Sequence, residues 1–341
     1  MADFVSHCSW MRDIPDNARV TTLSIPGTHD SCSIDGLLGF GKTQNLDLDD
    51  QLNAGIRFLD IRLAHYQDNL FAHHNAVHMG KSWADILEIC SNFLNKYPTE
   101  TVLMSVKEEE RFDGVLGRFA PSEAFGKPRR DPENWVIRSH SFEDAFKSRT
   151  WQHIDDPSLL YNFPPPLPGG RPAANRALTP KITLGEVRGK IVLLRRFEAT
   201  PEVGFDLTCW PKNQHFKSDG SLACNIEDCY RNPGEENKYE CIVGHIEEAH
   251  QGDLEALYIT FLSAIGMKAS RYSKTINRYL NVYLTGLPKG TRVGIIVMDY
   301  FEQPRKLVSH VIKLNERMRD RRPVSKRSAE DVPSTSSGLT V

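Results

Sequence analysis

The residues in this sequence that are best suited to catalysis are ionisable side chains at the ends of short apolar segments. They are His29, Asp30, Asp60, Arg62, His74, Lys107, Arg196 and Asp299. Two imidazoles oriented by carboxylates can act as a general base and a general acid, and cations between them can stabilise charge that develops on a phosphoryl group. The set therefore predicts cleavage of a phosphodiester by a neighbouring hydroxyl group, in which one histidine accepts a proton and the other donates one.

Each part of this set, taken alone, also has a purely structural explanation. The consecutive pair His29 and Asp30 could cap a turn. Alternation along residues 56–63 places Asp60 and Arg62 on one face of a strand, where they could form an ordinary ion pair. What favours an active site is that charged residues recur at the ends of successive predicted strands.

Histidine and cysteine residues raise the question of a metal site. Adjacent residues on a strand point to opposite faces, so His73 and His74 cannot easily share one metal ion, and we expect one in the site and the other packed or solvated. The seven cysteines show no C-x-x-C spacing, and we interpret them as mostly reduced thiols. Four of them lie within residues 209–241 at spacings that match no common zinc finger. A disulfide between two of these four remains an alternative if the protein is exported. The run Glu108–Glu110 is interpreted as solvated.

The pattern of apolar segments predicts an α/β protein. Strands are expected over 21–25, 56–63, 69–74, 101–107, 191–197, 258–263 and 293–300. Pro26 and Gly27 are expected to end the first strand, residues 82–97 form an amphipathic helix with Ser82 as N-cap, and the polar segment 211–240 is expected to be a long loop. Strands that alternate with helices favour a parallel barrel, and the active site of such a barrel lies at the carboxyl ends of its strands.

Length and composition are those of a globular protein with a large core. The chain has 341 residues, of which 40% are hydrophobic and 25% charged, and its net charge is −2. This charge argues against nucleic acid as a partner. No apolar run is long enough to span a membrane.

We expect three segments along the chain. Residues 1–19 form an N-terminal lead-in, residues 20–318 a single barrel domain, and residues 319–341 a disordered tail rich in serine and threonine. The N-terminus has no basic start followed by an apolar core, so we expect no secretory signal. A monomer in the cytoplasm or at a membrane periphery is the expected form, with secretion left open.

Six motifs of the sequence closely resemble the X-domain of phosphatidylinositol-specific phospholipases C, and most of all the small single-domain enzyme of bacteria. They are Ser24-Ile25-Pro26-Gly27-Thr28-His29-Asp30, Phe58-Leu59-Asp60-Ile61-Arg62, His73-His74, Leu103-Met104-Ser105-Val106-Lys107, Gly189-Lys190-Ile191-Val192-Leu193-Leu194-Arg195-Arg196 and Val293-Gly294-Ile295-Ile296-Val297-Met298-Asp299-Tyr300. The resemblance runs in order from about residue 18 to about residue 315. It implies a distorted TIM-type (β/α) barrel that cleaves phosphatidylinositol at a membrane surface to diacylglycerol and inositol 1,2-cyclic phosphate.

The resemblance also implies a role for each residue of the set. His29 would deprotonate the inositol 2-hydroxyl with Asp299 as its partner, and His74 would protonate the leaving oxygen with Asp30 as its partner. Arg62 would bind the phosphate beside Asp60. The residues that would hold the inositol ring are Lys107, Arg196, Asp228 and Tyr230.

Arg62 is the residue on which the prediction about a cofactor depends. Calcium-dependent members of the family surround the phosphate with an acidic metal cage, whereas a fixed guanidinium here can do the electrostatic work of a metal, so we expect no metal and no other cofactor. Two alternatives remain. One is a metal-dependent phosphodiesterase or phospholipase on the same barrel, and the other is a catalytically inactive module that binds inositol lipids.

Overall fold

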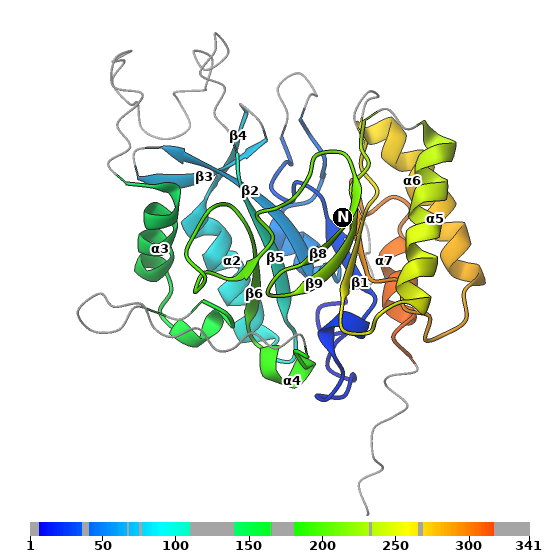
Figure 1. Ribbon diagram of the computed structural model, residues 1–341, viewed down its shortest axis with the longest axis horizontal. Helices are drawn as coiled ribbons and strands as arrows, with labels where there is room; N and C mark the ends of the chain where they lie inside the picture. The colour runs from blue at the N-terminus through cyan, green and yellow to red at the C-terminus, as the bar shows by residue number, and fades with distance from the viewer. Residues whose placement is uncertain are drawn as a thin grey trace, which may run out of the picture.

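A curved parallel sheet forms the centre of the molecule (Figure 1). The computed structural model describes residues 7–35, 41–66, 68–74, 77–109, 140–163, 165, 181–231, 234–264 and 269–316. The tail predicted over 319–341 lies outside these residues. The division of the chain into lead-in, barrel and tail therefore stays a prediction.

Within the described residues, eight strands follow one another around the sheet in parallel pairs, in the spatial order β7-β6-β5-β2-β1-β11-β10-β9. Their bounds are β1 (Ile25–Thr28), β2 (Phe58–Tyr66), β5 (Val102–Glu108), β6 (Ile191–Arg196), β7 (Phe205–Asp206), β9 (Ala223–Glu227), β10 (Leu257–Phe261) and β11 (Ile295–Met298). Three strands pair antiparallel with this set: β3 (Asn69–His74) with β2, β4 (Val77–Ser82) with β3, and β8 (His215–Asp219) with β9.

The barrel is distorted where its two edges meet. No backbone ladder joins β7 to β8 in the part of the chain that the structure describes. The edges are linked instead by a side chain, since the N–H of Asp206 donates to Oγ of Ser221 at 3.0 Å. The expected α/β fold, a distorted (β/α) barrel, is confirmed.

Helices cover the outside of the sheet, with α2 and α3 on one side and α5, α6 and α7 on the other (Figure 1). Their bounds are α1 (Leu48–Asn53), α2 (Trp83–Lys96), α3 (Phe142–His153), α4 (Leu184–Val187), α5 (Glu235–Gln251), α6 (Ala269–Gly286) and α7 (Leu307–Lys313), with short 3-10 turns at Val20–Thr22 and Pro157–Leu159. Ser82 caps α2 as predicted, because its hydroxyl accepts the N–H of Asp85. None of the described helices is long and apolar enough to cross a membrane.

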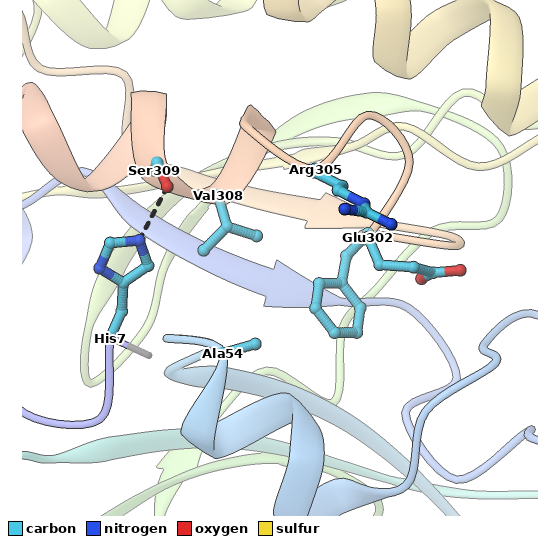
Figure 2. A pocket seen from close by; sticks show the side chains of 7 residues that line it. His7, Ala54, Glu302, Arg305, Val308 and Ser309 are labelled. Atoms are coloured by element: carbon cyan, nitrogen blue, oxygen red, sulfur yellow. Dashed lines mark hydrogen bonds between the residues drawn. The ribbon is translucent and has the colours of Figure 1, made fainter. Parts of the chain in front are cut away.

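The lead-in packs against the amino ends of the strands. Trp10 and Met11 are buried in the core, and the N–H of Met11 donates to Glu100 at 3.1 Å. Glu100 in turn forms a fully buried ion pair with Arg57 at 2.9 Å. His7 ties the lead-in to α7 through a 2.7 Å hydrogen bond between its Nε2 and Oγ of Ser309, beside a small cavity that none of the predicted site residues lines (Figure 2).

The first strand differs from the prediction. Pro26 and Gly27 lie inside β1 instead of ending it. Pairing with β2 begins only at Gly27 and Phe58. The carbonyl of Pro26 accepts the N–H of Arg57 at 2.9 Å. The N–H that proline lacks therefore leaves no gap in the described ladder. A Cβ atom on residue 27 would lie 2.8 Å from Cβ of Phe58, so glycine is what lets the two strands approach.

The segment 211–240 is also different, because it holds β8, β9 and the start of α5 in place of a long loop. β8 lies at the edge of the sheet, and its residues alternate between exposed and half-buried. An edge strand with so little burial carries a polar sequence and gives almost no signal of alternation. Asp228 therefore directly follows a paired strand, and Tyr230 stands two residues further on.

Candidate active site

The predicted residues converge on the carboxyl ends of the parallel strands. His29 and Asp30 follow β1 and Asp299 follows β11, and these two strands pair in register from Ile25 and Ile295 onward. The other predicted residues lie on β2, β3, β5 and β6 or just after β9, at Asp60, Arg62, His74, Lys107, Arg196 and Asp228. Strand pairing brings together side chains that are distant in the sequence, as when Arg62 of β2 stands beside Lys107 of β5.

His29 lies between a carboxylate and a guanidinium. Its Nδ1 is 2.8 Å from Oδ1 of Asp299, and its Nε2 is 2.8 Å from Nη2 of Arg62. A guanidinium can only donate, so this contact assigns a lone pair to Nε2 and the proton to Nδ1, where Asp299 accepts it. The ring also lies edge-on to Phe261, with 6.0 Å between the ring centroids.

The surroundings of His29 make it a strong base. Burial lowers the pKa of its imidazole, but the negative charges of Asp30 and Asp299 outweigh burial and raise the pKa to about 9. At neutral pH this favours the protonated ring, whereas the contact with Arg62 requires the neutral one. The observed geometry is therefore that of the deprotonated ring, the form that can accept a proton.

Asp30 joins both histidines to the guanidinium. Its Oδ1 lies 2.5 Å from Nε of Arg62, and its Oδ2 lies 3.3 Å from Nε2 of His74 and 3.5 Å from Nε2 of His29. Burial raises the pKa of this carboxyl group, but the positive charges of Arg62 and His74 outweigh it and lower the pKa to about 2. The backbone of Asp30 adopts a left-handed conformation with φ of 43°, which is strained for a residue other than glycine.

His74, and not its neighbour His73, faces this carboxylate. The second ring nitrogen of His74, Nδ1, lies 2.7 Å from the carbonyl oxygen of Gly41. A carbonyl can only accept, so Nδ1 carries a proton. His73 instead lies across the β3–β4 ladder against His78, with 5.4 Å between the ring centroids.

Arg62 is the centre of the charged cluster. Besides Asp30 and His29, its guanidinium contacts Oδ2 of Asp60 at 3.3 Å and Oε1 of Glu109 at 3.3 Å. These carboxylates raise the pKa of Arg62 above its ordinary value despite burial. Glu109 corrects the interpretation of the glutamate run as solvated, because its side chain is only 6% exposed and also binds Nζ of Lys107 at 3.2 Å.

A second group of side chains extends the site from Asp60. Nη1 of Arg196 lies 3.4 Å from Oδ1 of Asp60, and its guanidinium stacks 3.6 Å from the ring centroid of Trp210. The indole N–H of Trp210 donates to Oδ2 of Asp228 at 2.9 Å. Arg195 lies outside this group and binds Asp206 at 2.8 Å, as expected for the next residue on a strand.

Tyr230 is placed less closely than the other predicted residues. Its side chain is half-buried, and its N–H donates to Oδ1 of Asn213 at 2.8 Å. It stands two residues beyond Asp228 on the segment that leads from β9 to α5.

One group in the site has donor atoms close enough to bind a metal. Among the described residues, His29, Asp30 and Asp60 offer donor atoms that all lie within 4.8 Å of one another. The guanidinium of Arg62 contacts all three of these side chains. A metal ion would have to displace this cation, so the donor set does not fit a resident metal.

Sequence reasoning missed Glu109, Trp210 and Phe261 as members of the site. Glu109 directly follows β5, the strand that pairs with the strand of Arg62. The register of this pairing, with Arg62 opposite Lys107, brings Glu109 close to Arg62. Trp210 precedes a proline in a segment without regular structure, and Phe261 ends an ordinary apolar strand. No local motif distinguishes these three from structural residues.

No model of a known protein family matches the sequence. The chain is 26% identical over 317 residues to the 1-phosphatidylinositol phosphodiesterase of Listeria monocytogenes, which covers 90% of this chain and 84% of that protein. It is also 35% identical over 77 residues to the human PI-PLC X domain-containing protein 1, a match that covers 22% of this chain and 24% of that protein.

Solved structures agree with the sequence matches. The phosphatidylinositol-specific phospholipase C of Listeria monocytogenes superposes with a TM-score of 0.65 at 26% identity, over 91% of this chain and 99% of that one. The Staphylococcus aureus enzyme of the same name shares the fold, with a TM-score of 0.71 at 24% identity over 91% of this chain and 97% of that one. By sequence and by fold, the chain resembles the small bacterial phosphatidylinositol-specific phospholipases C.

Proposed function

We propose that this protein is a phosphatidylinositol-specific phospholipase C. The inositol 2-hydroxyl attacks phosphorus, the bond from phosphorus to the glycerol oxygen breaks, and the products are diacylglycerol and inositol 1,2-cyclic phosphate. The observation that carries this proposal is the His29 ring between Asp299 and Arg62, with His74 on the other side of Asp30. A base, a cation and an acid around one point are what this reaction requires.

His29 is the proposed general base. Nε2 takes the proton of the 2-hydroxyl, and Asp299 stabilises the imidazolium that forms, because its carboxylate accepts the Nδ1 proton at 2.8 Å. When the ring is neutral, the lone pair of Nε2 accepts from Arg62. A bound phosphate is a stronger acceptor than a neutral ring, so it draws the guanidinium away and frees the base.

His74 is the proposed general acid. Its Nε2 proton passes to the glycerol oxygen as the bond to phosphorus breaks, which balances the proton that His29 has taken. Asp30 holds the ring from 3.3 Å and stays ionised, since its pKa is about 2. The carbonyl of Gly41 fixes the orientation of the ring from its other nitrogen.

Arg62 binds the phosphate in this proposal, and Asp60 and Glu109 orient the guanidinium. Its planar fork can donate two parallel hydrogen bonds to two phosphoryl oxygens, and it stabilises the charge that develops on them. The ring hydroxyls of inositol are held by Lys107, Arg196, Asp228 and Tyr230.

The reaction is proposed to need no metal, because Arg62 occupies the space in which a metal would sit. The second candidate function is a metal-dependent phosphodiesterase, in which His29, Asp30 and Asp60 would have to hold the ion in place of the Arg62 guanidinium. The third, a lipid-binding module without catalysis, has no use for a base and an acid that share one carboxylate.

The proposed partner is a membrane surface that contains phosphatidylinositol, and the proposed form is a monomer at the membrane periphery or in the cytoplasm, with no nucleic acid bound. The test measures release of inositol phosphate from phosphatidylinositol vesicles, in EDTA and in calcium, with His29→Ala beside the wild type. We expect equal activity in both buffers and none in the variant. Activity in calcium alone would favour the metal-dependent candidate, and inactivity in both buffers would favour the binding module.

A further inference from the structure

Lys238 is a buried lysine near the start of α5 that the proposed chemistry does not use. Its side chain is fully buried, and its ammonium group donates to both carboxylate oxygens of Glu227, at 3.0 and 2.8 Å, and to the carbonyl of Cys229 at 2.9 Å. These bonds use all three ammonium protons. A cation near a helix N-terminus is opposed by the helix dipole, and its burial has a further cost. Stability of the helix therefore does not explain a lysine at this position.

The partner of Lys238 lies directly beside a predicted site residue. Glu227 is the last residue of β9, and its side chain is buried against α5, where Oε1 also accepts the N–H of Cys229 at 3.1 Å. The next residue, Asp228, meets Trp210 and so joins the active site. The ion pair thus holds the residues on both sides of Asp228.

The rest of this segment is anchored on the opposite side. The N–H of Asp228 donates to the carbonyl of Gln214 at 3.2 Å. Oδ1 of Asn213 accepts the N–H groups of Tyr230 and Arg231, at 2.8 and 2.6 Å. Hydrogen bonds from residues 213–214 therefore hold one side of the segment, and the buried ion pair between Glu227 and Lys238 ties the other side to α5.

We propose that Glu227 and Lys238 are positioning residues for substrate recognition. They fix the backbone of residues 227–229 so that Asp228 and Tyr230 stand where the inositol ring is bound. An apolar pair could fill the same space, but it would leave the N–H and the carbonyl of Cys229 without these partners. The identity of the ligand rests on the proposed function, whereas the positioning itself is a property of the folded chain.

The first test reads the position of Asp228 without any substrate. The indole N–H resonance of Trp210 reports on its hydrogen bond to Asp228, and Trp210→Phe assigns that resonance. Glu227→Gln and the double variant Glu227→Gln/Lys238→Met are compared with Glu100→Gln. Glu100 is a matched control, because it forms a fully buried ion pair with Arg57 at the amino ends of the strands.

We expect the Trp210 resonance to shift, and its exchange with solvent to accelerate, in the two Glu227 variants but not in Glu100→Gln. The double variant leaves no unpaired buried charge, so it keeps the test valid if another variant folds poorly. An unchanged Trp210 resonance in folded Glu227 variants would overturn the proposal. An equal shift in Glu100→Gln would also overturn it, since the effect would then be one of general destabilisation.

The second test measures function. We expect Glu227→Gln to raise the KM for phosphatidylinositol and the inhibition constant of myo-inositol about tenfold, with a smaller change in kcat, because a misplaced binding group weakens ground-state contacts. Glu100→Gln should leave both constants unchanged. Unchanged constants in an active Glu227→Gln protein would refute the recognition role. A wild type that neither cleaves phosphatidylinositol nor binds myo-inositol would instead refute the proposed function, while the Trp210 test still decides the positioning.

Discussion

Arg62→Lys is the substitution that tests the proposed mechanism most directly. Lysine keeps the positive charge but replaces a planar fork by one ammonium group with three donors. The guanidinium contacts Asp30, Asp60, Glu109 and His29 at once, and it would also have to donate to the phosphate. An ammonium group that binds the carboxylates cannot also form a bidentate contact with a phosphoryl group.

The magnitude follows from the bonds that are lost. A hydrogen bond between charged groups contributes about 1.5–3 kcal/mol, and we expect at least one such bond to the transition state to disappear. A loss of about 3 kcal/mol lowers kcat roughly 10²-fold. Stability should fall as well, because Asp60 and Glu109 are buried and lose part of their compensation.

The assay compares kcat in EDTA and in calcium for Arg62→Lys and the wild type, with circular dichroism to verify folding. A variant that keeps more than about half of the wild-type activity would refute the bidentate role of Arg62. Recovery of the variant by calcium alone would show instead that the carboxylates around Arg62 work with a metal ion.

Four further predictions concern ionisation and packing. The ring of His29 should titrate near pH 9 in NMR spectra, and Asp299→Asn should lower this pKa, because the carboxylate that raises it is removed; an unchanged pKa would refute the assignment of Asp299 as its partner. Since the pKa of His29 is raised from 6.5, its contribution to the free energy of unfolding is fully present below pH 6.5 and is lost as pH rises toward 9. Urea titrations should show this loss in the wild type but not in His29→Gln. The pKa of Asp30 is lowered from 3.8 to about 2, so its contribution to the free energy of unfolding is present above pH 3.8 and is lost as pH falls through 2. Asp30→Asn should therefore make the free energy of unfolding depend less steeply on pH in acid, and an unchanged slope would contradict this. Gly27→Ala should destabilise the fold by about 1–3 kcal/mol in thermal unfolding, because the new Cβ would lie 2.8 Å from Cβ of Phe58, and full stability would show that the strands can separate without cost.

The sequence was most informative where local pattern and position coincide. Alternation along β2 placed Asp60 and Arg62 on one face, and the structure confirms their contact at 3.3 Å. The position of charges at strand ends predicted that His29 and Asp299 would lie at the same end of the barrel, and the family resemblance implied that they would pair, as they do at 2.8 Å. The shared face and the shared end of the barrel need only the strand period and the direction of the strands.

The rest depended on strand pairing, which one sequence does not specify. Glu109 looked like the middle of a solvated run because its burial arises from β2, about fifty residues earlier in the chain. β8 looked like a loop because an exposed edge strand has no apolar face. Pro26 looked like the end of a strand because the sequence does not show where β2 begins. It is that register which lets Pro26 lie in β1 without interrupting the hydrogen bonds to β2.

The charge balance of the site bears on which phosphate esters it accepts. Among the described residues, five carboxylates gather around three cations of the lysine and arginine type: Asp30, Asp60, Glu109, Asp228 and Asp299 around Arg62, Lys107 and Arg196. Because these cations already lie beside carboxylates, an incoming phosphate competes for them, and a dianion meets more repulsion than a monoanion. A phosphodiester and a cyclic phosphate carry one negative charge each, whereas a phosphomonoester carries close to two at neutral pH. The site is therefore suited to bind the diester and form the cyclic product, and we expect inositol 1-phosphate to inhibit less strongly as rising pH removes its second proton.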